Sequence, residues 1–288
     1  MFNYMRIASV LSILFLSGFI SESFSQEIPT PVTARLVSDS SEINSGESIK
    51  LGVLFDIDPG WHIYWKYPGQ TGLPTKVNFH APDGFKLDEI NWPLPMAFEK
   101  PEGGVDYGYE KSVLLWTDIQ IPSDLSESKI DEFGAKASWV SCKEICIPGR
   151  ADLKYDVKTE GSELRKNEAI FAKWQRLVPN TVSAEENPFE INANRLRIDA
   201  RTLRIELDII SNGQYKKVEF YPTPGDSRKV KNVKTVEFGQ GNSTNMSFDV
   251  ITKSEQEISD NEMSGILVYS NESGKRSAIE IDIKLADN

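Results

Sequence analysis

Cys142 and Cys146 are the only cysteines in the 288-residue chain, and three residues separate them. A local crosslink stabilises a fold little: closing a five-residue ring contributes about 2 kcal/mol, whereas a hundred-residue loop contributes about 4.7 kcal/mol. Thiol–disulfide exchange, in contrast, requires a second thiol close by that resolves the mixed disulfide. The spacing therefore predicts a redox-active pair, with a metal clip and an inert structural disulfide as alternatives.

The metal alternatives differ in the ligands that they require. A zinc site needs two ligands besides the cysteines, and His62 and His80 are the only histidines. Two cysteines and one histidine form a soft site that suits copper. The alternative copper site therefore consists of Cys142, Cys146 and His62, whereas the redox reading needs no cofactor beyond the disulfide.

The residues between the cysteines also affect the thiols. Lys143 favours the thiolate form of its neighbour, and Glu144 opposes it. The spacer Lys143–Ile145 lies between a strand-like segment and the dipeptide Ile147–Pro148, so it can form the turn that such a pair requires. A turn of this kind has to accept both redox states.

The segment 59–75 is dense in aromatic residues and is interrupted by glycine and proline. Strand alternation places His62 and Tyr64 on one face and Trp61, Ile63 and Trp65 on the other. We interpret this segment as sandwich core followed by a turn. Under the functional interpretation it is a wall beside the cysteines, from which Tyr64 or His62 tunes or shields the thiols.

The segment 91–101 contains three prolines and several apolar side chains. Proline is excluded from central strands because it cannot donate to the ladder. We therefore expect an extended surface loop. It is either a lid over the disulfide or an ordinary packed loop.

Residues 1–25 are typical of a signal peptide: Arg6 is basic, residues 7–20 are almost all apolar, and small residues follow. The apolar run is shorter than the roughly 20 residues that span a membrane. We therefore expect an exported, periplasmic mature chain without stable membrane insertion, and an uncleaved N-terminal anchor is the alternative. The formal net charge of −11 argues against nucleic acid and anionic membranes as partners.

The rest of the chain is predicted to be all-β. Short segments rich in β-branched and aromatic residues alternate with turn residues, which favours a β-sandwich. Strands are expected at 33–37, 48–55, 76–79, 113–116, 135–140, 151–157, 195–199, 203–209, 217–221, 247–251, 265–269 and 278–283.

One segment, 162–178, has apolar residues at helical spacing, with Ser162 as the candidate N-cap and Pro179 after its end. We expect this helix to pack on the first sandwich, and a partner-binding helix is the alternative. The predicted organisation is a signal peptide at 1–25, a redox β-sandwich at 26–158, a helical connector at 159–183 and a second β-sandwich at 184–288.

Five motifs occur in the order seen in a known family. They are Gly-Trp-His-Ile-Tyr-Trp at 60–65, Pro-Gly-Gln-Thr-Gly-Leu-Pro-Thr at 68–75, Trp-Pro-Leu-Pro at 92–95, Tyr-Gly-Tyr-Glu at 107–110 and Trp-Val-Ser-Cys-Lys-Glu-Ile-Cys-Ile-Pro at 139–148. Over about residues 60–150 the chain resembles the periplasmic N-terminal region of the DsbD/ScsB-type thiol:disulfide interchange proteins. The helix and the start of the second β-domain also resemble the ScsB-type branch.

The resemblance implies an immunoglobulin-like sandwich whose cysteine pair accepts electrons and passes them to periplasmic substrates. By position, Cys146 resembles the cysteine that forms the mixed disulfide with a thioredoxin-like partner, and Cys142 resembles the one that resolves it. A cap loop with an aromatic tip shields the pair in that family, which places the cap in 93–101 with Phe98 as its tip. The three-residue spacer matches the ScsB-like branch, which is associated with copper tolerance.

The family continues into membrane helices and a thioredoxin-like domain, whereas this sequence stops at Asn288. We therefore expect the electron donor to be a separate thioredoxin-like domain or a membrane electron-transfer protein like DsbD, ScsB or CcdA. The expected substrates are periplasmic thiol oxidoreductases, and a role in cytochrome c biogenesis is among the implied functions. A non-catalytic, adhesin-like or scaffolding double sandwich is the alternative of another class.

Overall fold

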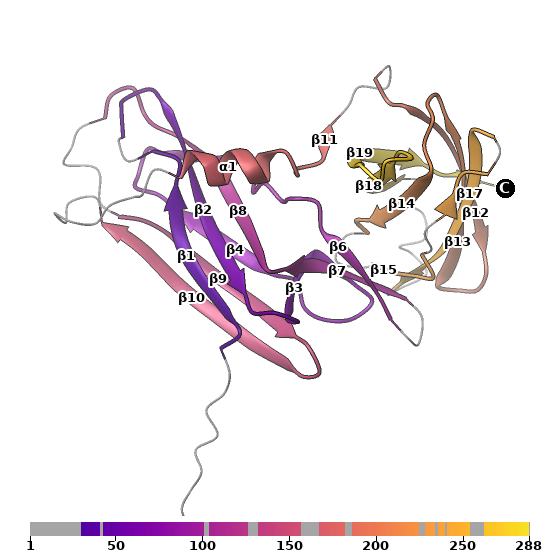
Figure 1. Ribbon diagram of the computed structural model, residues 1–288, viewed down its shortest axis with the longest axis horizontal. Helices are drawn as coiled ribbons and strands as arrows, with labels where there is room; N and C mark the ends of the chain where they lie inside the picture. The colour runs from indigo at the N-terminus through magenta and orange to yellow at the C-terminus, as the bar shows by residue number, and fades with distance from the viewer. Residues whose placement is uncertain are drawn as a thin grey trace, which may run out of the picture.

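The computed structural model describes residues 30–40, 43–100, 104–125, 132–156, 167–181, 186–224, 228–233, 236–239, 241–253 and 262–287. Within these residues the chain consists of β-strands and one short helix (Figure 1), which confirms the all-β prediction. The strands before the helix are β1 (Val32–Ser38), β2 (Ser48–Ile57), β3 (His62–Gly69), β4 (Lys76–His80), β5 (Lys86–Leu87), β6 (Met96–Glu99), β7 (Val105–Glu110), β8 (Ser112–Gln120), β9 (Glu132–Cys142) and β10 (Cys146–Asp156).

The helix is α1 (Glu168–Gln175), and a second set of strands follows it. These strands are β11 (Asn180–Thr181), β12 (Phe189–Arg197), β13 (Thr202–Ser211), β14 (Lys217–Pro222), β15 (Arg228–Lys231), β16 (Val236–Glu237), β17 (Ser243–Thr252), β18 (Glu262–Ser270), β19 (Arg276–Lys284) and β20 (Ala286–Asp287). A strand occurs at every segment where the sequence predicts one.

The strands before α1 form an antiparallel sandwich of two sheets. One sheet has the order β1-β2-β8-β5, and the other has the order β10-β9-β3-β7-β6, with β4 also paired to β9. Aromatic residues from both sheets meet in the core: the Phe55 and Trp139 rings, for example, are 5.3 Å apart in an edge-to-face arrangement. This is the immunoglobulin-like sandwich that the resemblance implies.

Strand β3 follows the predicted alternation. Ile63 and Trp65 are fully buried in the core, and Trp61 packs against the same cluster. His62 and Tyr64 therefore lie on the opposite face of the sheet. The register between β3 and β7 shifts between Tyr64 and Gly69, and such an irregularity re-aims the side chains next to it.

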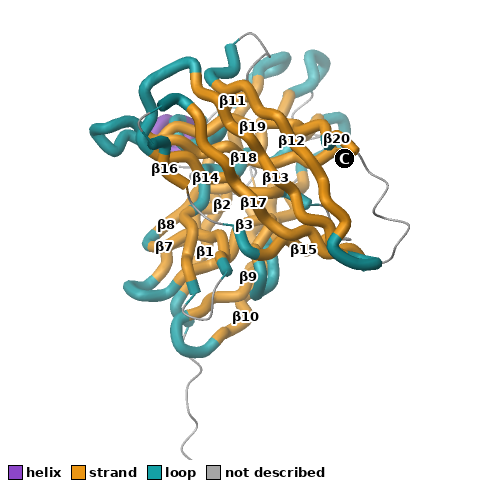
Figure 2. The backbone as a smooth tube through the Cα atoms, turned by 90° about the vertical axis from the view of Figure 1, so that its right-hand side faces the viewer, coloured by secondary structure: helices purple, strands orange, loops and turns teal. Residues whose placement is uncertain are grey.

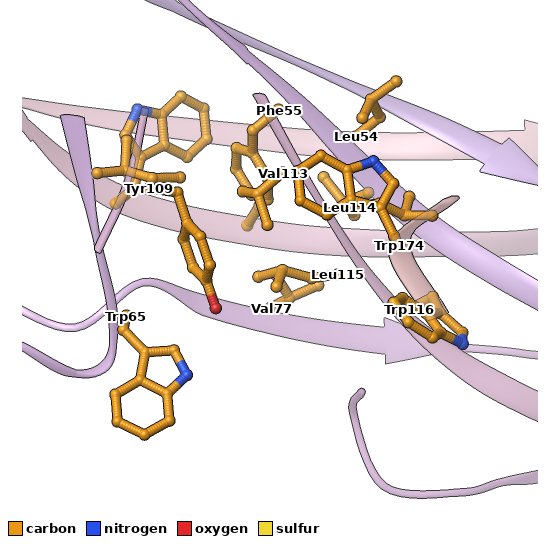
Figure 3. Close-up of a cluster of buried hydrophobic side chains, with 14 of the residues drawn as sticks. Leu54, Phe55, Trp65, Val77, Tyr109, Val113, Leu114, Leu115, Trp116 and Trp174 are labelled. Carbon is orange, nitrogen blue, oxygen red and sulfur yellow. The ribbon is translucent and has the colours of Figure 1, made fainter. Parts of the chain in front are cut away.

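Helix α1 covers the outer face of the first sheet. Its Phe171 and Trp174 are buried and belong to the core cluster that contains Leu54 and Leu114 (Figure 3). The Phe171 ring lies 6.2 Å from the ring of Trp116 on β8. The expected packing of this helix on the first sandwich is confirmed.

The strands after α1 form a second sandwich. Its sheets have the orders β11-β19-β18-β14-β16 and β15-β17-β13-β12-β20 (Figure 2). Alternating hydrophobic residues explain why this part of the chain forms a sandwich. In β13, for example, Leu203, Ile205, Leu207 and Ile209 are buried, as expected of a strand with one face on a core.

The two sandwiches touch through aromatic and aliphatic side chains. Tyr221, Ile266 and Val268 of the second sandwich belong to the core cluster of the first. The Tyr221 and Tyr107 rings lie 4.5 Å apart. Because Tyr107 lies on β7, the second sandwich supports the strand that pairs with β6.

Several sequence predictions need correction or lie outside the described residues. The segment 91–101 is not entirely loop, because Met96–Glu99 forms β6 at the edge of the second sheet, where nearby prolines are tolerated. Helix α1 begins at Glu168 after Asn167. The predicted N-cap Ser162, the signal peptide at 1–25 and the predicted domain junctions near 158 and 183 lie outside the described residues.

Removal of the helix side chain that is buried on the first sandwich tests the packing of α1. We expect Trp174→Ala to lower the free energy of unfolding by about 3–5 kcal/mol, because it deletes a large buried ring and leaves a cavity. Gln175→Ala, an exposed position on the same helix, should change it by about 0.5 kcal/mol or less. Urea unfolding followed by circular dichroism measures both, and equal values would contradict the packing.

Candidate active site

The two cysteines face each other at the end of a long hairpin. Strands β9 and β10 pair without a break from Glu132↔Asp156 to Cys142↔Cys146. The cysteines form a disulfide with their Cα atoms 4.2 Å apart, close to the spacing of a non-hydrogen-bonded antiparallel pair. The turn Lys143–Ile145 joins the strands, and the Lys143 amide donates to the Ile145 carbonyl at 3.1 Å.

The two sulfur-bearing residues differ in exposure. Cys142 is 3% exposed, whereas Cys146 is exposed on the hairpin. The buried Ser141 hydroxyl donates to the Ile147 carbonyl at 3.0 Å and fixes the end of the ladder beside the pair. Thiol–disulfide exchange depends on which sulfur an incoming thiolate can reach, and here that sulfur belongs to Cys146.

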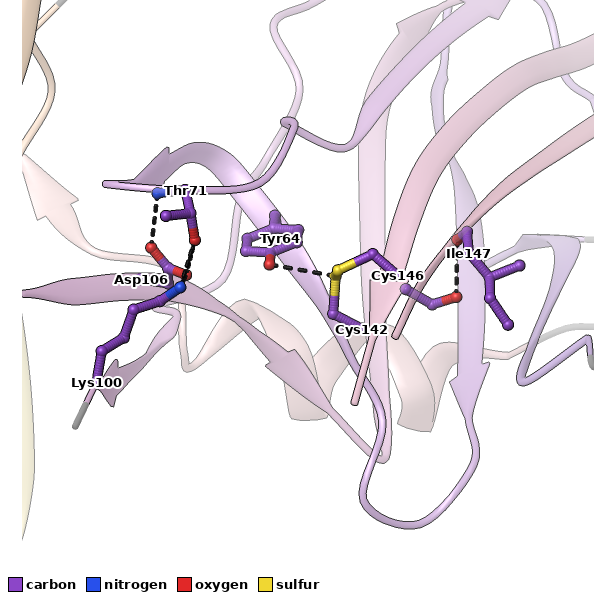
Figure 4. Close-up of a disulfide and its surroundings, with 8 residues drawn as sticks. Tyr64, Thr71, Lys100, Asp106, Cys142, Cys146 and Ile147 are labelled. Atoms are coloured by element: carbon purple, nitrogen blue, oxygen red, sulfur yellow. Dashed lines mark hydrogen bonds and ion pairs between the residues drawn. A yellow bond between two sulfur atoms is a disulfide. The ribbon is translucent and has the colours of Figure 1, made fainter. Parts of the chain in front are cut away.

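Tyr64 lies beside the buried cysteine. Its hydroxyl donates a hydrogen bond to Cys142 Sγ at 3.3 Å (Figure 4). Burial raises the pKa of Tyr64 above its usual value, and the nearby Asp106 carboxylate raises it further. The phenol therefore remains protonated at neutral pH and keeps its proton available for the sulfur.

A close backbone approach fixes the Tyr64 ring. Gly72 has a φ of +82°, and a Cβ at this position would lie 2.3 Å from the Tyr64 ring. Only glycine combines this left-handed backbone with so close an approach. The loop 70–75 is therefore held directly against the ring that contacts the sulfur.

The buried carboxylate of Asp106 ties this loop to β7. It accepts hydrogen bonds from the Thr71 amide at 2.9 Å and the Thr71 hydroxyl at 2.6 Å. It also forms an ion pair with Lys100 Nζ at 2.9 Å (Figure 4). Three donors compensate the burial of this charge, and they connect the loop to the β6–β7 hairpin.

His62 and Phe98 form an aromatic contact next to Tyr64. The Phe98 ring on β6 stacks on the His62 ring with centroids 4.8 Å apart, and His62 meets Tyr64 edge-to-face at 5.2 Å. In register, His62 lies opposite Cys142. Burial lowers the pKa of His62 below its usual value, so the imidazole is neutral near pH 7.

The remaining predicted neighbours lie on the exposed turn. Lys143 and Glu144 are both exposed. The Lys143 side chain lies next to Gly60, where an added Cβ would come within 3.2 Å of Lys143 Cε. Ile145 between them and Cys146 is 61% exposed, so the turn presents an apolar side chain beside the accessible sulfur.

Only one histidine lies near the cysteines. His80 pairs with Gly134 on β9, whereas His62 pairs with Cys142, and at about 3.3 Å per residue these positions are about 26 Å apart. Among the described residues there is no group of three or more His, Cys, Asp or Glu side chains arranged to hold a metal ion.

Sequence reasoning identified Cys142, Cys146, Tyr64, His62 and Phe98, and the structure brings these five residues together. It missed the residues that hold Tyr64 in place, namely Gly72, Thr71, Lys100 and Asp106. The sequence does contain one indication that Asp106 is a structural residue: it is the single carboxylate inside the run Val-Asp-Tyr-Gly-Tyr. An acidic residue in such a strand needs partners if it is buried.

Comparison with known proteins agrees with this geometry. Residues 33–157 match the family model described as "Thiol:disulfide interchange protein DsbD, N-terminal". The fold is similar to the crystal structure of the N-terminal periplasmic domain of ScsB from Proteus mirabilis, with a TM-score of 0.63 and 17% identity. That match covers 90% of this chain and 95% of the other.

Two further solved structures have TM-scores too low to support a comparison. One is a protein of unknown function from Porphyromonas gingivalis W83, with a TM-score of 0.22 and 10% identity over 88% of this chain and 100% of the other. The second is the periplasmic chaperone SfaE, with a TM-score of 0.19 and 10% identity over 89% of this chain and 100% of the other. A search of curated proteins finds no match. None of the helices in the described ranges has the length and apolar character needed to cross a bilayer.

The family match and the disulfide together support thiol–disulfide exchange in general. The matched range contains both cysteines, Tyr64, His62 and the β6–β7 hairpin. Residues 33–157 thus match the DsbD N-terminal family model, and the fold of most of the chain is similar to that of the periplasmic ScsB domain.

Proposed function

We propose that the chain relays electrons in the periplasm through a reversible Cys142–Cys146 disulfide, between a thioredoxin-like donor and oxidised substrate proteins. The observation that carries the proposal is the asymmetry of the pair. The Cys146 side is exposed, whereas Cys142 is buried and accepts a hydrogen bond from Tyr64. One sulfur is thus open to attack, and the other is supported as it leaves.

The first step of the proposed reaction is attack by a donor thiolate on Cys146 Sγ. A bond forms between the donor sulfur and Cys146, the Cys142–Cys146 bond breaks, and its electron pair moves to Cys142 Sγ. Leaving sulfurs depart faster when their thiolate is stabilised. The Tyr64 hydroxyl is placed to stabilise it, because it already donates to this sulfur in the disulfide form.

In the second step, the donor's other thiolate attacks its own sulfur in the mixed disulfide and releases Cys146 as a thiolate. The donor becomes a disulfide, and the pair has gained two electrons and, after protonation, two protons. The reverse sequence reduces a substrate: Cys146 attacks the substrate disulfide, and Cys142 resolves the intermediate. These roles of the two cysteines agree with the positions implied by the family motif.

The proposed partners are a thioredoxin-like domain or a DsbD-, ScsB- or CcdA-like membrane protein as donor, and periplasmic thiol oxidoreductases as substrates. The exposed Ile145 supports protein partners, since it offers apolar contact area beside the accessible sulfur. The periplasmic location is supported by the signal-like residues 1–25 and by the description of the similar ScsB domain as periplasmic.

We propose the β6–β7 hairpin, with Phe98 on β6, as the cap of the site. The Phe98 ring stacks on the His62 ring. Lys100, which follows β6, forms an ion pair with Asp106 on β7. In this conformation Cys146 remains exposed. The cap therefore supports the buried side of the pair, where Tyr64 and Cys142 lie.

Copper binding by the reduced pair is the alternative proposal. His62 lies opposite Cys142 on the adjacent strand, and two thiolates with an imidazole are a donor set that Cu(I) accepts. Reduction has to come first, because both sulfurs are used in the disulfide.

The two cysteines should differ in reactivity when each is present alone. We expect Cys142→Ser, which keeps Cys146, to react rapidly with 5,5′-dithiobis(2-nitrobenzoate) and to trap a thioredoxin-like protein as a mixed disulfide. Cys146→Ser, which keeps the buried Cys142, should react at least about tenfold more slowly and trap none. If Cys146→Ser traps partners as well as Cys142→Ser does, the assigned roles are wrong.

Loss of the Tyr64 hydroxyl should slow reduction of the disulfide. Hydrogen bonds to charged groups contribute about 1.5–3 kcal/mol, and about 1.4 kcal/mol is a factor of ten in rate. We therefore expect dithiothreitol to reduce Tyr64→Phe at least about tenfold more slowly than the unchanged protein, in stopped-flow measurements at pH 7. Tyr215→Phe makes the same chemical change in the second sandwich and should leave the rate unchanged; equal rates for both variants would contradict the role of Tyr64.

The copper alternative predicts near-stoichiometric Cu(I) binding by the reduced protein, measured by competition with a chromophoric chelator. Binding should disappear in the Cys142→Ser/Cys146→Ser variant and weaken in His62→Gln. Unchanged binding in the double cysteine variant, or none against a micromolar competitor, would exclude this site.

A further inference from the structure

A cleft between the two sandwiches lies outside the disulfide site. One wall consists of residues 66–70 and 72–74 with Val105 and Tyr107, and the other consists of Arg201, Pro222, Pro224 and the segments 228–233 and 251–253. Its volume of about 660 Å³ falls in the range of about 300–1,000 Å³ typical of ligand-binding clefts. Figure 1 shows β15 between the two halves, and β15 contacts β3 across this gap.

The cleft is basic, although the chain as a whole carries a net charge of −11. Lysine and arginine are the only charged residue types among the described residues that line it, and no Asp or Glu is among them. The cationic residues are Lys66, Arg201, Arg228, Lys229, Lys231 and Lys253. Such a concentration of one sign on a protein of the opposite sign attracts anionic ligands.

Lys66 contributes a cation from the first sandwich. Its ammonium lies 5.6 Å from the Trp65 ring centroid and 5.7 Å from that of Tyr67. Burial lowers the pKa of Lys66, and Glu280 and Glu89 act in the opposite direction. An anion in the cleft would therefore add to the charges that stabilise this partly buried ammonium.

The shape of the cleft indicates an extended occupant. Four consecutive residues of β15, Arg228–Lys231, line it, and side chains alternate between the two faces of a strand. The cleft therefore runs along the edge of β15. Strand β15 ends its sheet and, among the described strands, pairs only with β17, so its other edge has no strand partner within these residues.

Apolar contacts distinguish this cleft from a site for a small inorganic anion. Leu73, 64% exposed, and Val105 lie on the wall opposite β15, together with Pro68 and Pro74. A strand with alternating acidic and apolar side chains matches both the cations and these apolar surfaces. Its backbone would add to the β15 edge, as in strand-addition complexes.

We propose that the cleft binds an extended acidic peptide segment of a partner protein, which pairs with β15 and places its carboxylates against Lys66, Arg201, Lys229 and Lys231. The segment contacts the outer side of the 66–74 loop, whose residue Gly72 supports Tyr64 from the inner side. Such a site holds a partner next to the disulfide without using either cysteine.

The test uses the full mature chain and the peptide fluorescein-Thr-Glu-Val-Glu-Val-Glu-Thr-amide, labelled at its N-terminus, in fluorescence anisotropy at low ionic strength. We expect saturable binding that weakens as salt is added. Binding should weaken at least tenfold in Lys229→Glu/Lys231→Glu. It should stay within twofold in Lys86→Glu/Lys284→Glu, which makes the same charge change at exposed positions outside the cleft.

Three probes separate the parts of the proposal. A peptide with Gln in place of Glu should bind at least tenfold more weakly, and so should a peptide N-methylated at alternate residues, because it cannot pair with β15. Inorganic tripolyphosphate should not displace the acidic peptide at equal charge concentration. Equal binding by the N-methylated peptide, displacement by tripolyphosphate, or equal loss in both double-lysine variants would overturn the proposal.

Discussion

The register of the β9–β10 hairpin is the constraint on which the site depends. Eleven consecutive residue pairs, ending at Cys142↔Cys146, fix which faces of the two strands look into the core. A slip by one residue would turn every side chain of a strand to the opposite face. Trp139, buried against Phe55 and within 2.3 Å of where a Gly149 Cβ would lie, anchors this register three residues before the disulfide.

The hairpin alone would present two similar sulfurs, and the rest of the sandwich makes them different. Strand β3 runs along β9 and brings Tyr64 to Cys142, while the turn leaves Cys146 exposed. The position of Tyr64 depends in turn on Gly72 and on Asp106, which binds the loop through Thr71. The second sandwich extends this support to β7 through the contact between Tyr221 and Tyr107.

The sequence predicted the sandwich because its strands have one buried face, and their alternation is visible in segments such as 203–209. Cys142, Cys146 and the face shared by His62 and Tyr64 could also be predicted, since they follow from spacing and from the period of two. Strand β6 was missed because an edge strand has too few buried residues to show a pattern. The partners of Asp106 and the basic cleft were missed because they are formed by segments that are far apart in the chain, so that local patterns carry no sign of them.

The most direct test of the account is the reduction potential of the Cys142–Cys146 pair, measured on the mature protein equilibrated in dithiothreitol and glutathione buffers. The account predicts a value between about −180 and −270 mV, the range of working thiol–disulfide oxidoreductases. It also predicts that the reduced and oxidised proteins share one fold by circular dichroism. A value below about −300 mV, with thiols that react only after unfolding, would identify a structural disulfide and contradict the proposed electron relay.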